Sequence, residues 1–158
     1  MEIFSNFPLW AALIAIVFAQ FIKIPIKLIV ARELSFRIAF STGGMPSSHS
    51  AAVTSLTTAV GIVEGVTSTI FAVACVFSVI TMYDASGIRR HAGKHAVVLN
   101  RLMNDLQTIF EDVRDWNKKE DKERREDLKE LLGHEPIEVF FGAITGIIVA
   151  FVVHPWFI

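Results

Sequence analysis

Hydrophobic residues in this chain are gathered into four long runs, and most polar residues lie between the runs. The runs cover residues 7–22 (extendable to 31), 49–63, 66–82 and 139–158. A helix needs about 17–25 residues to cross the hydrocarbon core of a bilayer, so each run approaches the length of one crossing. The second and third runs are rich in Ser and Thr, which suits helices that pack on protein partners. The pattern predicts one all-α membrane domain, residues 1–158, built as a bundle of about four transmembrane helices.

The composition also favours the bilayer, because 53% of the residues are hydrophobic and the mean hydropathy is +0.50. The net charge of −1 gives no reason to expect a nucleic-acid partner. The single cysteine, Cys75, cannot form an internal disulfide. No basic region or A-x-A cleavage site accompanies the first run, so we expect that run to remain in the mature protein.

The positive charges predict an orientation. All 15 Lys and Arg residues lie either in the first connection (Lys23, Lys27, Arg32 and Arg37) or between residues 89 and 129. Four crossings put these two connections on the same side of the membrane, and the positive-inside rule makes that side cytoplasmic. We therefore expect a plasma-membrane protein of bacterial type with both termini outside.

The long connection before the last run has a helical pattern of its own. Residues 91–133 are expected to form a charged cytoplasmic helical insertion, and residues 118–127 within it carry a dense run of mixed charges that suits a solvated surface. An amphipathic stripe of apolar residues recurs at spacings of three and four. Its members are Leu99, Leu102, Leu106, Ile109, Val113 and Trp116. The stripe is expected to pack on the protein or lie at the membrane surface, and pairing with a second copy in a homo-oligomer is also open.

The segment 46-PSSH-49 precedes the second run and is the first candidate for chemistry. Pro46 suits the first turn of a helix, and either Ser47 or Ser48 is a suitable cap. The unpaired N–H groups at a helix start form a ready anion site, and His49 would lie beside a bound anion. The alternative is a turn and a serine cap at a polar membrane boundary, with no chemistry.

The end of the third run carries Arg89 and Arg90, whose guanidinium groups match phosphate oxygens. Ordinary anchoring at the cytoplasmic face is the alternative. A metal site built from Asp84, His91 and His95 is a weaker hypothesis, because no third ligand is in obvious register with the two histidines. We therefore expect no metal and no cofactor.

The fourth run is preceded by His134 and Glu138, which are four residues apart. On a helix, a carboxylate at this spacing can hold one imidazole nitrogen as N–H and leave the other nitrogen to attack or to accept a proton. A helix start with a favourably placed Glu is the alternative. His49, the arginine pair and this pair all fall at one depth on one face of the expected bundle, as a phosphate site requires.

The segments GGMPSSHSA, YDASGIRRHAG and LGHEPIEVFFGAITG together resemble the divergent, membrane-embedded branch of the type-2 phosphatidic acid phosphatase superfamily, which is related to acid phosphatases and vanadium haloperoxidases. The resemblance covers nearly the whole chain. It implies that His49, in PSSH, is the general acid for the leaving group. It also implies that His134 is the nucleophile and that Glu138, in place of Asp, orients it. Arg89 or Arg90 resembles the arginine of the superfamily's third motif, S-R-x5-H-x3-D, whose histidine and carboxylate correspond to His134 and Glu138.

The chain departs from the superfamily pattern in two places. No K-x6-R-P motif is present, and Lys27 and Lys23 are the candidates for its lysine. The charged insertion separates the arginine of the third motif from His134. A rival interpretation keeps the motif spacing through Arg89-x5-His95, but Leu99 then stands where the orienting carboxylate belongs. This favours His134 over His95.

The resemblance implies metal-independent hydrolysis of a phosphate monoester or pyrophosphate on a lipid through a phosphohistidine. Lys27, the arginines and the N–H groups around Ser47 and Ser48 would hold the phosphoryl group. Phosphatidate, phosphatidylglycerophosphate and an isoprenyl pyrophosphate all fit. The alternative is a non-catalytic membrane protein that binds or carries lipid phosphates, or a scaffold that acts through its cytoplasmic helix.

Overall fold

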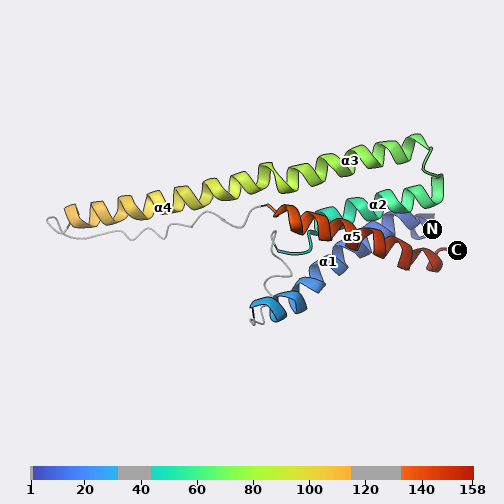
Figure 1. Ribbon diagram of the computed structural model, residues 1–158, viewed down its shortest axis with the longest axis horizontal. Coiled ribbons are helices and arrows are strands. Elements are labelled where there is room, and N and C mark those ends of the chain that lie inside the picture. Colours follow the sequence, from blue (N-terminus) through green and yellow to red (C-terminus); the bar gives the residue numbers. More distant parts are fainter. Residues whose placement is uncertain (1, 32–43, 115–132) are drawn as a thin grey trace.

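The protein is described here from a computed structural model, which places residues 2–31, 44–114 and 133–158 (Figure 1). These residues form helices and contain no strand, which confirms the all-α prediction. In chain order the elements are η1 (Glu2–Ser5), α1 (Phe7–Ala31), α2 (Ser48–Glu64), α3 (Thr69–Ser86), α4 (Ile88–Arg114), α5 (Pro136–Val153) and η3 (His154–Trp156).

Three helical stretches are long and apolar enough to cross a bilayer: Phe7–Ile29, Thr69–Leu106 and Pro136–Trp156. The predicted helical membrane bundle is therefore confirmed. The remaining expected crossing corresponds to α2, whose 17 residues lie at the lower end of the length that a crossing requires. The middle stretch is longer than its hydrophobic run, because α3 passes into α4 at Gly87 with almost no change of direction (Figure 1).

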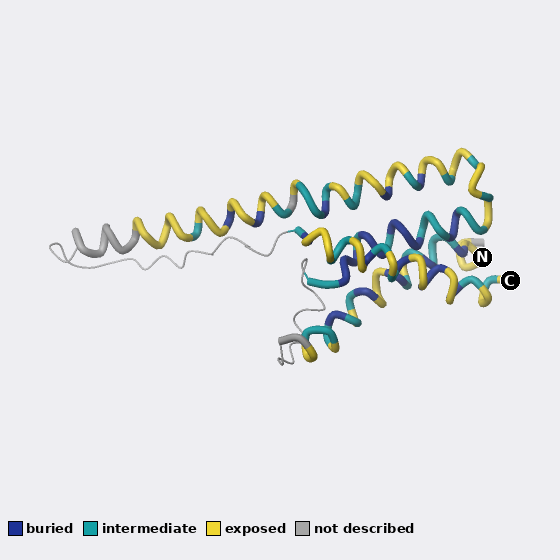
Figure 2. The backbone as a smooth tube through the Cα atoms, viewed as in Figure 1, coloured by how far each residue is buried: buried dark blue, intermediate teal, exposed yellow. Residues whose placement is uncertain are grey.

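Helix α2 is the centre of the bundle and packs against α1, α3 and α5. Small residues allow this close packing. Ala11, Ala15 and Ala19 are fully buried on one face of α1, while Gly142 and Gly146 are buried on α5. Figure 2 shows that the buried positions of α1, α2 and α5 face one another, whereas α3 and α4 are largely exposed. The exposed apolar side chains of α3 are those expected of a helix that faces lipid.

Hydroxyl groups join α2 to its neighbours. The Thr57 hydroxyl lies 2.7 Å from the Ser78 hydroxyl on α3, and Ser78 donates to the carbonyl oxygen of Val53 at 2.9 Å. On the α5 side, the Thr54 hydroxyl lies 3.0 Å from the carbonyl oxygen of Ala143. Thr54, Thr57 and Ser78 thus satisfy their hydroxyl groups inside the protein, where lipid offers no partner.

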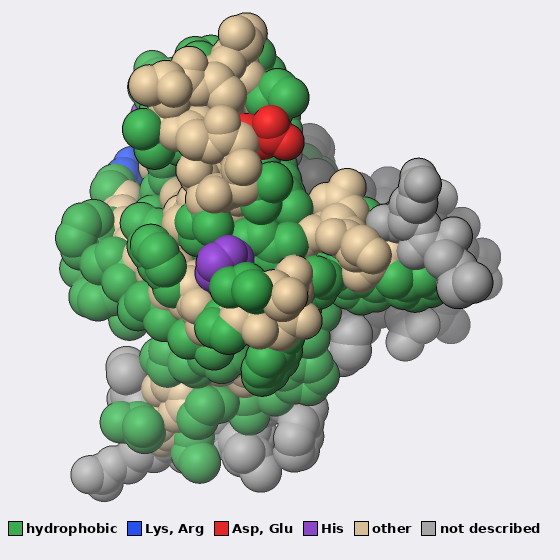
Figure 3. Space-filling model, turned by 90° about the vertical axis from the view of Figure 1, so that its right-hand side faces the viewer, with side chains coloured by type: hydrophobic (Ala, Val, Ile, Leu, Met, Phe, Trp, Pro, Cys, Tyr) green, Lys and Arg blue, Asp and Glu red, His purple; other side chains and the backbone are tan. Residues whose placement is uncertain are grey.

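Both termini and the Gly65 turn lie at the same end of the bundle (Figure 1). Seen from that end, the surface is mostly hydrophobic and carries few charged side chains (Figure 3). The described Lys and Arg residues are on the opposite halves of α1 and α3–α4, as the charge pattern predicted. Arg32 and Arg37 lie outside the described residues. The side of the membrane that each end faces stays a prediction.

Helix α4 continues α3 away from the bundle and contains the first part of the predicted amphipathic stripe (Figure 1). Leu99, Leu102 and Leu106 are 47%, 51% and 39% exposed, so the stripe is largely uncovered here. The side chains of Ile109 and Val113 lie outside the described part of the chain. So do Trp116 and the charge run 118–127.

Candidate active site

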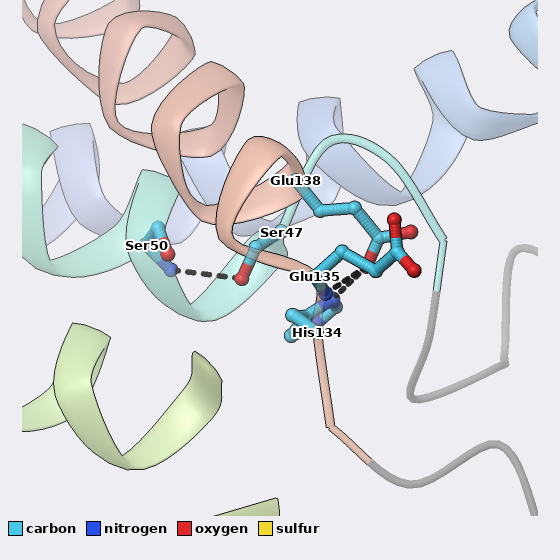
Figure 4. A network of polar contacts seen from close by, with 5 residues as sticks. All are labelled: Ser47, Ser50, His134, Glu135 and Glu138. Atoms are coloured by element: carbon cyan, nitrogen blue, oxygen red, sulfur yellow. Dashed lines mark hydrogen bonds and ion pairs between the residues drawn. The ribbon is translucent and has the colours of Figure 1, made fainter. Parts of the chain in front are cut away.

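The buried centre of the candidate site is the pair formed by His134 and Glu138 (Figure 4). Nδ1 of His134 lies 3.0 Å from Oε2 of Glu138, and only 2% of His134 is exposed. The same carboxylate oxygen accepts the backbone N–H of Glu135 at 3.1 Å. An ionised carboxylate can only accept, so Nδ1 carries a proton, and in a neutral imidazole the lone pair is then on Nε2.

Nε2 of His134 is buried and has no hydrogen-bond partner in the part of the chain that the structure describes. A buried polar atom of this kind costs free energy, because it has lost water and gained nothing in exchange. Most buried polar atoms in folded proteins are paired, so an unpaired one needs a reason. A nitrogen kept available for a substrate is such a reason.

His49 completes the histidine pair from α2. Its half-buried ring packs edge-on against the ring of His134, with centroids 5.8 Å apart and an interplanar angle of 63°. The two histidines are far apart in the sequence, and the packing of α2 on α5 brings them together. A phosphoryl group bound beside one imidazole would therefore be close to the other.

Backbone hydrogen bonds fix the helix ends around this pair. The N–H of Ser47 donates to the carbonyl oxygen of Glu138 at 3.0 Å, and the N–H of His134 donates to the carbonyl oxygen of Ala85 at 2.9 Å. Ser47 Oγ caps α2 by accepting the N–H of Ser50 at 3.3 Å. The start of α2, the end of α3 and the start of α5 thus meet at one joint.

Gly142 permits the closeness of this joint. A Cβ at this position would lie 2.5 Å from the carbonyl oxygen of Ser47 and 2.9 Å from Cβ of Ser50. Both distances are far below ordinary contact, so no side chain fits without a shift of the backbone. The G-x-x-x-G pair of α5 therefore has a direct role in placing the serine cap against the His134–Glu138 pair.

The predicted phosphate-binding residues come from α1, the start of α2 and α4. Ser47 and Ser48 are both buried at the start of α2. Lys27 is half-buried on α1, and Arg90 is half-buried on the first turn of α4. The backbone of Arg89 belongs to α4, but its side chain lies outside the described residues.

Lys23 is a site residue that the sequence identified only as a second choice. It is 1% exposed, although it carries a charged amine on a helix whose buried face is otherwise apolar. The available signal was a lysine inside the otherwise apolar first run. The sequence contained nothing to say that α1 would bury this lysine while Lys27 stays half-buried.

The rival nucleophile and the metal hypothesis both depend on α4. His91 and His95 are exposed there, whereas His134 is buried against His49. Within the ranges that the structure describes, no group of three or more His, Cys, Asp and Glu side chains could hold a metal ion.

Comparison with known proteins agrees with the resemblance in the motifs. Residues 4–149 match a family model described as the divergent PAP2 family. The chain belongs to this family. The family model spans all three segments that carry the resemblance, so the predicted membership is confirmed.

A curated relative extends the likeness over the full length. The uncharacterized membrane protein YuiD of Bacillus subtilis (strain 168) is 53% identical over 157 residues, which cover 99% of each chain. No solved structure matches. The likeness to the membrane protein YuiD and the three apolar helices together support a membrane location. Membership in the divergent PAP2 family indicates a phosphatase-related membrane protein.

Proposed function

We propose that the protein is a membrane-embedded phosphatase that hydrolyses a phosphate monoester or pyrophosphate on a lipid through a phosphohistidine. One observation carries the proposal: the imidazole of His134 is held at Nδ1 by Glu138, and its buried Nε2 has no hydrogen-bond partner in the described residues. An oriented imidazole with an available lone pair is a prepared nucleophile.

In the proposed reaction, Nε2 of His134 attacks phosphorus and forms a P–N bond as the P–O bond to the lipid breaks. His49 gives a proton to the leaving oxygen, so the lipid departs as an alcohol or a phosphate. Glu138 accepts the Nδ1–H bond throughout and stabilises the positive imidazole that forms. Water then attacks the phosphohistidine, with His49 taking its proton, and inorganic phosphate leaves.

The phosphoryl oxygens need donors and cations. The first turn of α2 supplies the positive end of a helix dipole and the N–H of Ser48, while the N–H groups of Ser47 and Ser50 already donate to Glu138 and to Ser47 Oγ. Lys27 and the Arg89–Arg90 pair supply the positive charge. Because Nε2 is buried in this structure, substrate entry has to displace part of what covers it. The position of the joint at one end of the apolar helices suits an amphiphile whose tails remain in the bilayer, and the positive-inside rule makes that end cytoplasmic.

The test is phosphate release by purified protein in nanodiscs that contain a panel of lipid phosphates, with EDTA present. We expect release that persists in EDTA and that falls by roughly 10³-fold or more in His134→Ala. His95→Ala is the matched control, because it removes an exposed histidine and should leave the rate unchanged. Rapid quenching with labelled substrate should trap a phosphoprotein that is labile to acid and stable to base in wild type only.

Other outcomes would point elsewhere. No turnover of any lipid phosphate, with binding retained, would reject the phosphatase and support a binding or carrier protein. Turnover that EDTA abolishes would support a metal-dependent reaction. Loss of activity in His95→Ala but not in His134→Ala would assign the nucleophile to α4.

A further inference from the structure

Helix α4 presents an apolar stripe that is uncovered over its described part. Leu99, Leu102 and Leu106 are 47%, 51% and 39% exposed, and Met103 beside them is 44% exposed. The three leucines follow one another at the spacing of the a and d positions of a coiled coil, with Leu99 and Leu106 at a and Leu102 at d. A contiguous apolar surface on a helix marks an interaction site when water would otherwise cover it.

The bilayer is too thin to cover this part of the stripe. The helical stretch Thr69–Leu106 has 38 residues. It is about 57 Å long at 1.5 Å per residue, which is nearly twice the ~30 Å of the hydrocarbon core. The crossing starts at Thr69, and even with a tilt of about 40° it is complete within about 26 residues. Because α4 continues α3 almost straight, Leu99 and the residues after it project beyond the hydrocarbon (Figure 1).

The residues that border the stripe argue against an anchor in the lipid headgroups. An amphipathic helix that lies on a membrane surface places Lys and Arg beside its apolar face, where they meet anionic lipids. The borders here carry Val98, Met103 and Asp105, while Arg101 lies on the opposite side of the helix. The stripe therefore lacks the positive border that a lipid surface selects.

A second copy of the chain fits the stripe in both charge and direction. Charged residues at the e and g positions choose the partner of a coiled coil, and Val98 and Met103 at these positions give no charge by which to select a different protein. Copies in one membrane share one orientation, so their α4 helices run parallel and meet through the same face. Asp105 is at a g position and lies opposite an e position of the other copy, so the two Asp105 side chains do not face each other.

We propose that α4 pairs in parallel with α4 of a second copy through the stripe, as a two-stranded coiled coil beyond the hydrocarbon core. Each α4 directly follows α3, whose Ala85 accepts the backbone N–H of His134. Pairing thus holds two bundles together with their candidate sites at the same face of the membrane. The pairing is independent of the proposed function.

Cysteine cross-linking in membranes tests which face of α4 pairs. Cys75 is first replaced by Ala, so that each introduced cysteine is the only one in the chain. Parallel pairing puts an a or d residue opposite its own copy, within the Cα separation of about 4.4–6.8 Å that a disulfide accepts. On oxidation, Leu99→Cys and Leu102→Cys should give disulfide-linked dimers, whereas Val97→Cys and Arg101→Cys, on the opposite side of α4, should stay monomeric. Equal cross-linking at all four positions would show random collision and overturn the pairing.

A charge in the stripe tests the strength of the pairing. Leu102→Glu places an unpaired carboxylate between the two helices, and Val97→Glu is the matched control with the same charge on the opposite side. Energy transfer between donor-labelled and acceptor-labelled copies, diluted in lipid vesicles, measures the dissociation constant. Leu102→Glu should raise this constant by about 100-fold or more, and Val97→Glu should change it by at most about 3-fold. A monomeric wild type, or an unchanged constant in Leu102→Glu, would overturn the pairing.

Two other coverings of the stripe give different results. A monomeric protein in which a dye on Leu102→Cys is quenched by lipid-borne quenchers would assign the stripe to the membrane surface. A monomeric protein in which Leu102→Cys resists a water-soluble maleimide, without quenching by lipid, would assign the cover to the chain itself. Either result would overturn the pairing. None of these measurements needs turnover, so an inactive protein that forms the predicted dimer would reject only the proposed function.

Discussion

Gly142→Ala tests the packing that holds the candidate site together. The new Cβ would lie 2.5 Å from the carbonyl oxygen of Ser47, where ordinary contact begins at 3.4 Å. The overlap of about 0.9 Å involves backbone, so α2 and α5 must move apart. Overpacking of this kind costs about 1–3 kcal/mol. At roughly 3 °C per kcal/mol for a chain of this length, the midpoint of thermal unfolding should fall by about 3–9 °C.

The same displacement should affect the chemistry. Ser47 donates to the carbonyl oxygen of Glu138, so a shift at Gly142 moves the start of α2 relative to the His134–Glu138 pair. A misplacement near 1 Å can lower a rate by about 10²-fold. The assays are the fraction of monodisperse protein left after heating in detergent and phosphate release in nanodiscs.

Gly61→Ala is the matched control for this substitution. It also lies in a helix, but its Cβ would meet only side-chain atoms, the ring of Phe71 at 2.9 Å and Cγ1 of Val66 at 3.7 Å, and the ring can rotate away. It should keep its activity and a midpoint near that of wild type. A Gly142→Ala protein as stable and active as Gly61→Ala would refute the close α2–α5 joint.

Three further predictions concern the histidine pair and the hydroxyl contacts. Glu138→Gln should fold and bind vanadate but lose about 10²–10⁴-fold in kcat, because an amide can hold the imidazole of His134 in the wrong tautomer. A retained kcat would remove Glu138 from the mechanism. His49→Asn should slow the hydrolysis of alkyl phosphates far more than that of p-nitrophenyl phosphate, because the nitrophenolate leaving group needs no proton. Equal losses of rate on both substrates would contradict a general acid at His49. Thr57→Val and Ser78→Ala should each destabilise the protein by about 1 kcal/mol in thermal unfolding. Because the two hydroxyls lie 2.7 Å apart, the double variant should lose less than the sum of the two single losses, and strict additivity would argue against the contact.

The hydrophobic runs predicted the fold class because few kinds of backbone structure can cross a bilayer. Backbone groups in lipid must bond within the chain, so a long apolar run between polar segments is read directly as a helix. The boundaries were less predictable. α1 ends at Ala31, the longer of the two limits that the sequence allowed, whereas the third run extends past its predicted end through Ser86 into α4. Hydropathy marks where a helix leaves lipid, which is not where its hydrogen bonds end.

Contacts between residues close in the sequence could be predicted at the site, whereas contacts between different helices could not. The spacing of His134 and Glu138 predicted their contact, although the geometry is different from that expected. His134 lies before α5 rather than on it, and Glu138 reaches back over the helix start to the N–H of Glu135 as well as to the imidazole. The burial of Lys23 depends on how α1 packs and diverges, and no local pattern encodes that.

The hydrogen bond between Ala85 and His134 explains how the third motif can be interrupted by a long insertion. The chain leaves the bundle at the end of α3, one helical turn before Arg89, and returns at His134, whose N–H donates to the carbonyl oxygen of Ala85 at 2.9 Å. The two ends of the insertion are therefore joined at its base. Loop-closure entropy grows slowly with length, so once the base is fixed, added residues cost little and need not disturb the joint. The chain segments before and after the insertion therefore stay adjacent in the fold, as the proposed split of the motif requires.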